Sequence, residues 1–133
     1  MNAKTFSTID TISCIVISLF LLFLFIYPHV KLVALRDDIT SLCDDVIEAA
    51  NAEQWEEARA CAGEIKERFT HELTLMRFIF DHEDVDNALD GIESVLLMTG
   101  REDATDTVIE TENVKGIVTY LAGIETFTWD SLF

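Results

Sequence analysis

The stretch TISCIVISLFLLFLFIY, from Thr11 to Tyr27, consists almost wholly of Leu, Ile, Phe and Val. Residues 11–30 carry no Asp, Glu, Lys or Arg. Twenty residues of helix, at about 1.5 Å each, span roughly 30 Å, which matches the hydrocarbon core of a bilayer. Tyr27 lies where an interfacial aromatic residue is expected. The sequence therefore predicts a short tail over residues 1–10 and a transmembrane anchor over residues 11–30, in contact with the lipid bilayer.

A cleaved signal peptide is the main alternative to an anchor, because both begin with a weakly basic stretch, here Lys4, followed by an apolar segment. The apolar segment is longer than the roughly 7–15 residues typical of signal peptides, and the bulky residues 25–29 offer no small-residue cleavage site. Lys4 and the terminal amine on one side balance Lys31 and Arg36 on the other, so the positive-inside rule does not decide the orientation. An uncleaved signal anchor predicts a single-pass cell-membrane protein whose soluble domain is extracytoplasmic.

Residues 31–133 form an acidic domain. After residue 36 the chain has 24 acidic residues against six basic residues, which gives a formal charge of −18. Nucleic acid is excluded as a partner, because phosphate backbones bind through Lys and Arg. A charge of this size is typical of solvated helix faces, and a cationic partner is the alternative.

Four amphipathic helical segments are predicted beyond the anchor, because apolar residues recur there at intervals of three and four. We expect the first segment to grow directly from the anchor, with Pro28 giving either a kink or the first turn of a renewed helix. The second segment is expected to be a single long helix. Few residues join the segments, which predicts an all-α fold with an antiparallel helical bundle of about four helices. The predicted segments cover residues 35–49, 55–80 and 84–99, and a fourth from residue 103 onward.

Turn and cap residues mark the ends of these segments. Gly100 is expected to end the third segment in a left-handed conformation. Asp103 and Asp106 are spaced like a capping box at the start of the fourth. Trp129 and Phe133 lie beyond the fourth apolar stripe, so they either pack across the bundle or form an interaction tail that contacts a partner.

The aromatic residues of the second predicted helix fit a packing role. Trp55, Phe69, Phe78 and Phe80 are expected to fill the core or a groove of the bundle rather than to bind a cofactor.

Cys43 and Cys61 lie nine residues on either side of residue 52, the middle of the first predicted turn. An antiparallel hairpin would bring them opposite each other, where a disulfide requires Cβ atoms about 4 Å apart. Two interpretations stay open: a disulfide if the domain is extracytoplasmic, or two small buried residues with free thiols if it is not.

Residues 81–87 hold four carboxylates and an imidazole, and His71 lies upstream. A calcium loop would need a glycine where the chain continues with Ala88, and a zinc-protease helix would need a second histidine where the chain has Leu75. Neither metal motif is complete. We expect Asp81–Asp86 to form a turn whose acidic side chains stabilise the positive amino terminus of the next helix.

Three elements stand out along the chain: Trp-Glu-Glu-Ala at 55–58, the segment at 81–87, and the apolar tail at 128–133. Together they resemble the bacterial DUF4363 family, small proteins of unknown function with one amino-terminal membrane helix and an acidic helical domain. The resemblance covers nearly the whole chain. Asp84–Val85 stands where the family tends to have Glu-Ile, and Ala88 replaces a larger apolar residue. The resemblance implies a fold and a location, but no activity and no site residue.

These observations predict a membrane-anchored, non-enzymatic helical protein that acts through protein contacts, as an accessory or scaffold at the cell envelope. No cofactor is expected, and the partner is an unknown membrane or envelope protein. Homo-oligomers are a further expectation, through the first amphipathic segment. The alternatives are a small enzyme or metal-binding domain around His71, His82 and Asp81–Asp86, and an acidic face that binds cations or a basic peptide.

Overall fold

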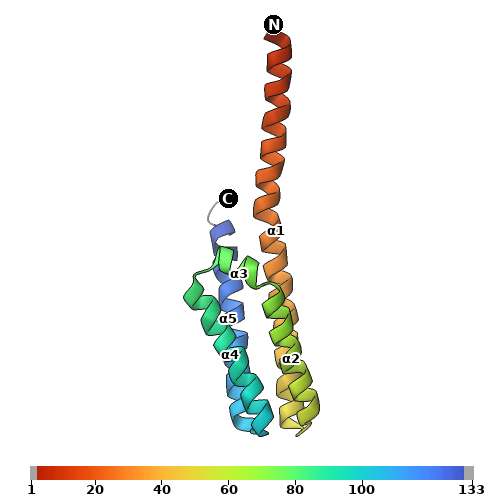
Figure 1. The fold of residues 1–133 in the computed structure, drawn as a ribbon, viewed down its shortest axis with the longest axis vertical. Coiled ribbons are helices and arrows are strands. Elements are labelled where there is room, and N and C mark those ends of the chain that lie inside the picture. Colours follow the sequence, from red (N-terminus) through yellow and green to blue (C-terminus); the bar gives the residue numbers. More distant parts are fainter. Residues whose placement is uncertain (1–2, 131–133) are drawn as a thin grey trace. The chain divides into compact units, whose positions relative to one another are not determined.

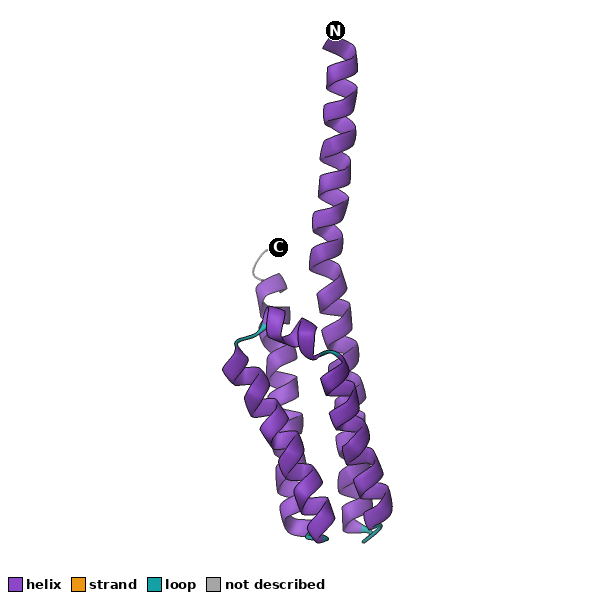
Figure 2. Ribbon diagram, viewed as in Figure 1, coloured by secondary structure: helices purple, strands orange, loops and turns teal. Residues whose placement is uncertain are grey.

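The computed structural model describes the backbone of residues 3–130 and the side chains of residues 8–124. Within residues 3–130 every regular element is a helix (Figures 1 and 2). The all-α prediction is therefore confirmed. The elements are α1 (Ala3–Asn51), α2 (Trp55–His71), α3 (Leu73–Ile79), α4 (His82–Arg101) and α5 (Ala104–Asp130).

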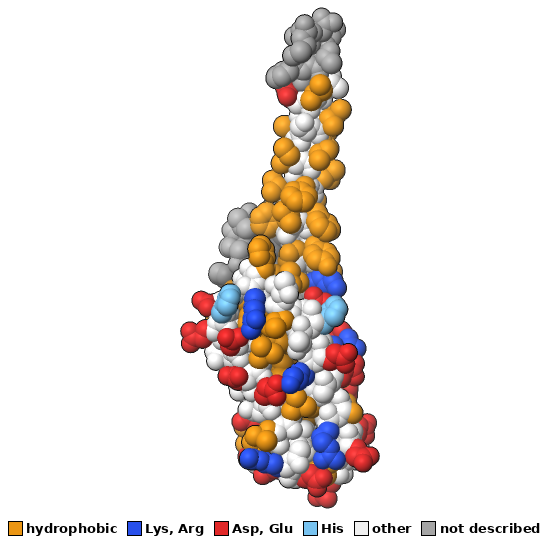
Figure 3. Space-filling model, viewed as in Figure 1, with side chains coloured by type: hydrophobic (Ala, Val, Ile, Leu, Met, Phe, Trp, Pro, Cys, Tyr) orange, Lys and Arg blue, Asp and Glu red, His pale blue; other side chains and the backbone are white. Residues whose placement is uncertain are grey.

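The chain divides into two compact units, Met1–Lys31 and Leu32–Phe133. The described part of the first unit is helical and almost wholly apolar (Figure 3). Among the described residues, one helical stretch, Thr8–Asn51, is long and apolar enough to cross a membrane. None of its most apolar window is buried within the protein. Pro28 lies inside α1, so no renewed helix begins there, whereas the expectation that the first segment grows directly from the anchor is confirmed.

The second unit is a helical bundle. The segment of α1 that begins at Leu32 contributes its apolar stripe to the core together with α2, α3, α4 and α5. Phe69 of α2 and Ile39 of α1 are fully buried in this core. The buried core residues are Leu32, Leu35, Ile39, Cys43, Val46, Ala62, Ile65, Phe69, Met76, Val85, Ala88, Ile92, Val95, Val114, Val118 and Leu121.

The predicted single helix over residues 55–80 is wrong, because Glu72 interrupts it. Glu72 has φ −94° and ψ 8°, outside the α-helical region, and it separates α2 from α3. The short α3 then carries the chain across to α4 (Figure 2). This crossing buries Met76, which is 2% exposed. The apolar stripe continues with helical spacing on both sides of Glu72, so the sequence pattern contains no signal for the break.

The left-handed stop predicted at Gly100 is also wrong. Gly100 lies inside α4, and the left-handed residue is Glu102, with φ 59°. One half of the predicted capping pair is present, since the Asp103 carboxylate accepts a hydrogen bond of 3.0 Å from the Asp106 backbone N–H. Glu102, a charged residue, thus takes the left-handed position that glycine usually occupies at a helix end.

The aromatic residues of α2 and α3 occupy different environments. Phe69 is fully buried, and Phe80 is half-buried against the core, as predicted. Trp55 is half-buried at the start of α2. Phe78 is 87% exposed, so its predicted packing role is wrong. It follows Met76 by two residues on a short helix, which turns its side chain away from the core.

Candidate functional site

Cys43 and Cys61 lie against the same core in the structure. Cys43 of α1 is fully buried, and Cys61 of α2 is half-buried beside the core. Both are free thiols. Burial, reinforced by the negative charge of Asp44, raises the pKa of Cys43 from 9.0 to about 12. Burial and nearby carboxylates also raise the pKa of Cys61.

Raised pKa values keep both thiols protonated near neutral pH, and a protonated thiol is a poor nucleophile. Neither Cys43 nor Cys61 therefore has the lowered pKa of an activated cysteine. The two cysteines are not bonded to each other in the structure, and the disulfide expected of an extracytoplasmic domain stays a prediction.

The acidic segment 81–86 starts a helix. The Asp81 carboxylate accepts a hydrogen bond of 3.2 Å from the Glu83 backbone N–H, which makes Asp81 the N-cap of α4. Asp86 forms an ion pair of 3.2 Å with Arg77 of α3. The predicted turn over Asp81–Asp86 is wrong, because α4 begins at His82 and residues 82–86 are helical. The cap formed by Asp81 matches the predicted stabilisation of a helix amino terminus by acidic side chains.

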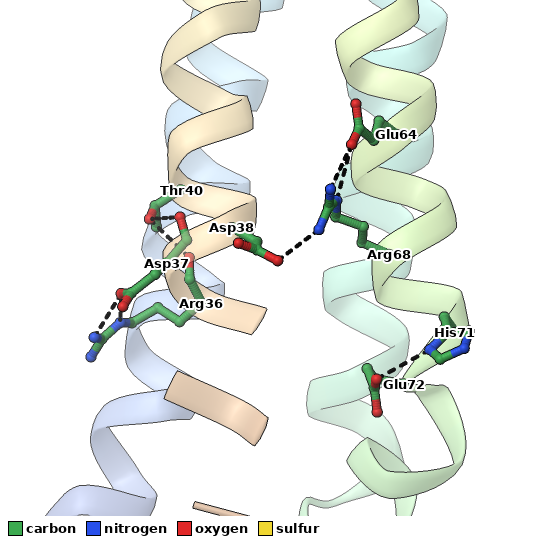
Figure 4. Close-up of polar contacts among 8 residues, drawn as sticks. All are labelled: Arg36, Asp37, Asp38, Thr40, Glu64, Arg68, His71 and Glu72. Atoms are coloured by element: carbon green, nitrogen blue, oxygen red, sulfur yellow. Dashed lines mark hydrogen bonds and ion pairs between the residues drawn. The ribbon is translucent and has the colours of Figure 1, made fainter. Parts of the chain in front are cut away.

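His71 and His82 are both exposed. His71 lies at the end of α2, where its Nδ1 is 3.1 Å from the Glu72 carboxylate (Figure 4). Across residues 8–124, no group of three or more His, Cys, Asp or Glu side chains is placed to hold a metal ion. The structure therefore does not assemble the proposed metal site around these histidines.

The Lys and Arg side chains of the bundle mostly join different helices. Arg68 of α2 contacts Asp38 of α1 at 2.7 Å and Glu64 on its own helix at 2.8 Å (Figure 4). Exposed pairs of this kind contribute about 1 kcal/mol or less each. Among the described residues from Leu32 onward, six of the seven Lys and Arg side chains form ion pairs, and Arg101 does not. The other pairs between elements are Lys115–Asp44, Lys66–Glu93, Arg59–Glu102 and Arg77–Asp86.

A groove lies between α4 and α5, and the sequence interpretation did not include it. Its volume is about 490 Å³, and it is open to solvent along one side. Buried Gly91 and Leu121 contribute to its floor, and Tyr120, which is 62% exposed, lies at its edge. The lining residues are Asp84, Asn87, Asp90, Gly91 and Ser94 from α4, and Glu110, Asn113, Ile117, Tyr120 and Leu121 from α5.

Small side chains on α4 explain why the two helices approach closely beneath the groove. A Cβ atom on Gly91 would lie 3.0 Å from Cγ2 of Val114, which is too close for ordinary packing. Asn87, Gly91 and Ser94 recur at intervals of four and three, so they share one face of α4. This spacing is the signal in the sequence that could have indicated the groove.

The groove is negatively charged. Its lining includes three carboxylates, Asp84, Asp90 and Glu110, and no Lys or Arg side chain. Within residues 8–124, none of the three carboxylates forms an ion pair. The groove therefore combines an apolar floor with carboxylates that lack a cationic partner in the chain.

Over residues 3–130, the fold is all-helical, with a helical bundle and one candidate membrane-spanning helix. Comparisons with protein-family models, curated proteins and solved structures give no match. The resemblance to the DUF4363 family stays a prediction.

Proposed function

We propose that this chain is a single-pass membrane protein whose acidic four-helix bundle binds a protein partner near the bilayer. Its task is that of an accessory or scaffold at the cell envelope, without catalysis of its own. The observation that carries this proposal is the exposure of the apolar side chains in the first unit, because no other part of that unit covers them. Fifteen large apolar residues between Ile9 and Val30 are 44–61% exposed.

Exposed apolar surface of this extent is unfavourable in water, at roughly 25 cal/mol for each Å². The hydrocarbon core of a bilayer removes this cost, and a helix satisfies its own backbone hydrogen bonds there. An ordinary amphipathic helix would instead present a charged face to water, as the later helices do. Tyr27 and Lys31 at the end of the segment suit the interface between lipid and water.

Binding rather than catalysis is supported by the chemistry of the bundle. The two cysteines outside the anchor have raised pKa values, and His71 and His82 are exposed. The bundle also has an acidic groove between α4 and α5, whose lining combines unpaired carboxylates with apolar side chains. A domain held beside the membrane through its anchor would meet membrane and envelope proteins at high effective concentration.

Reporter fusions to the carboxyl terminus test the anchor and its orientation together. Alkaline phosphatase is active outside the cytoplasm, whereas green fluorescent protein fluoresces inside it. We expect an active phosphatase fusion in the membrane fraction and a dark fluorescent fusion. A fluorescent fusion in the membrane fraction would show that the domain lies on the cytoplasmic side instead. Soluble fusions of both kinds would contradict the anchor.

A further inference from the structure

We propose that the groove between α4 and α5 binds a basic amphipathic helix of a partner protein. The inference rests on the proposed function, because it identifies the surface and the chemistry through which the bundle acts. It commits to one occupant, a helix with an apolar stripe flanked by Lys or Arg.

The dimensions of the groove fit a helix. Its lining on α4 extends from Asp84 to Ser94, which corresponds to about 15 Å, or nearly three helical turns. A helix laid along such a groove inserts apolar side chains at positions i, i+3 or i+4, and i+7. The floor of Gly91, Ile117 and Leu121 is apolar or small enough to receive them. Exposed Tyr120 offers an aromatic contact at the edge.

The charges of the groove select a basic occupant. Because Gly91 packs opposite Val114 and α4 and α5 are joined by a two-residue turn, the helices run antiparallel (Figure 1). Asp84 and Glu110 therefore lie towards opposite ends of the groove, and Asp90 lies between them. Lys or Arg on both flanks of a bound helix would meet these unpaired carboxylates.

A second copy of this chain fits the groove less well. The chain has a formal net charge of −16, and a symmetric contact through this face would bring identical carboxylates together. Like charges facing each other across an interface weaken it. Charge complementarity therefore favours a basic partner over self-association.

The test uses the full chain in phosphatidylcholine nanodiscs and a labelled synthetic 21-residue helix with a Leu stripe flanked by Lys. Binding is followed by fluorescence anisotropy near physiological salt, with empty nanodiscs measured in parallel. A second peptide has Glu in place of every Lys. We expect binding that depends on the chain for the Lys peptide and not for the Glu peptide.

Two double variants with the same change in charge locate the binding. Asp90→Asn with Glu110→Gln should weaken binding about tenfold, since each exposed pair contributes about 1 kcal/mol or less. Asp45→Asn with Glu67→Gln removes two exposed carboxylates outside the groove and should change the affinity by less than about twofold. Circular dichroism of both variants checks that the bundle is folded.

Equal weakening by the two double variants would overturn the inference, because it would mean diffuse attraction to the acidic surface. No binding to the chain, or equal binding of the Glu peptide, would also overturn it. So would a dimer that strengthens when Asp90 and Glu110 are neutralised, since the occupant would then be a second copy. A chain that enters nanodiscs but fails to bind the peptide contradicts only this inference. A chain that does not enter them contradicts the proposed function, and titration in solution then still tests the groove.

Discussion

Replacement of Phe69 by alanine removes the largest fully buried side chain among the described residues of the bundle. Phe69 lies on α2, is 0% exposed, and belongs to the core shared by the helices of the second unit. Deletion of a buried phenyl ring removes its burial free energy and leaves a cavity, which together cost about 3–5 kcal/mol. The unit Leu32–Phe133 is expected to have a free energy of unfolding of about 5–15 kcal/mol, so the loss is a large fraction of the total.

The magnitude translates into a thermal shift. In a domain of this size each kcal/mol corresponds to roughly 4–8 °C in Tm, so Phe69→Ala should lower Tm by about 20 °C. Circular dichroism at 222 nm, recorded on the full chain in detergent micelles, would follow the melting of the bundle. Urea unfolding of the same samples would give the change in free energy directly.

Phe78→Ala is the matched control, because it makes the same substitution nine residues later. Phe78 is 87% exposed, so its removal should change the free energy of unfolding by no more than about 0.5 kcal/mol. Similar losses for the two variants, or a loss below about 1 kcal/mol for Phe69→Ala, would refute this account of the core.

Burial raises the pKa of Cys43 from 9.0 to about 12, so the unfolded chain releases this proton at lower pH than the folded chain does. The stabilisation that comes from keeping this thiol protonated is complete below pH 9, and the free energy of unfolding should fall by up to roughly 1.4 kcal/mol per pH unit between pH 9 and about 12. Urea unfolding at several pH values should show a smaller fall for Cys43→Ala, and an equal fall would contradict the burial of Cys43. Glu53 adopts φ 58° after α1, so Glu53→Gly should stabilise the bundle by about 0.5–1 kcal/mol in urea, whereas an equal gain from Glu53→Ala would exclude relief of backbone strain as the cause. Asp81→Ala removes the N-cap of α4 and should cost about 1 kcal/mol, while Asp81→Asn should keep most of the stability; equal losses would contradict the capping role.

Local sequence patterns predicted those parts of the fold that local physics controls. Apolar residues at intervals of three and four predicted the helices, because one helix face must be buried. The start of α2 at Trp55 and the cap at Asp103 also agree with the sequence interpretation. The break at Glu72 was not predictable in this way, because it depends on the crossing from α2 to α4 rather than on any local residue preference.

The candidate site was less accessible to sequence reasoning than the helices were. The sequence placed the acidic segment from Asp81 at the amino terminus of the next helix, where Asp81 caps α4, because such a cap depends on neighbouring residues alone. The groove joins residues of α4 and α5 that only the pairing of these helices brings together. Its charge also depends on which carboxylates already have partners, and ion pairs such as Arg68–Asp38 link residues 30 positions apart.

Membrane flotation after an alkaline carbonate wash tests the anchor most directly. Leu19 and Leu22, which are 61% and 55% exposed, lie in the apolar stretch of α1. The unaltered chain should float with the lipid after the wash, whereas Leu19→Arg with Leu22→Arg should not, because each arginine near the bilayer centre costs about 2.5–3.5 kcal/mol on insertion. Release of the unaltered chain into the carbonate supernatant, or equally firm retention of the arginine variant, would contradict the anchor.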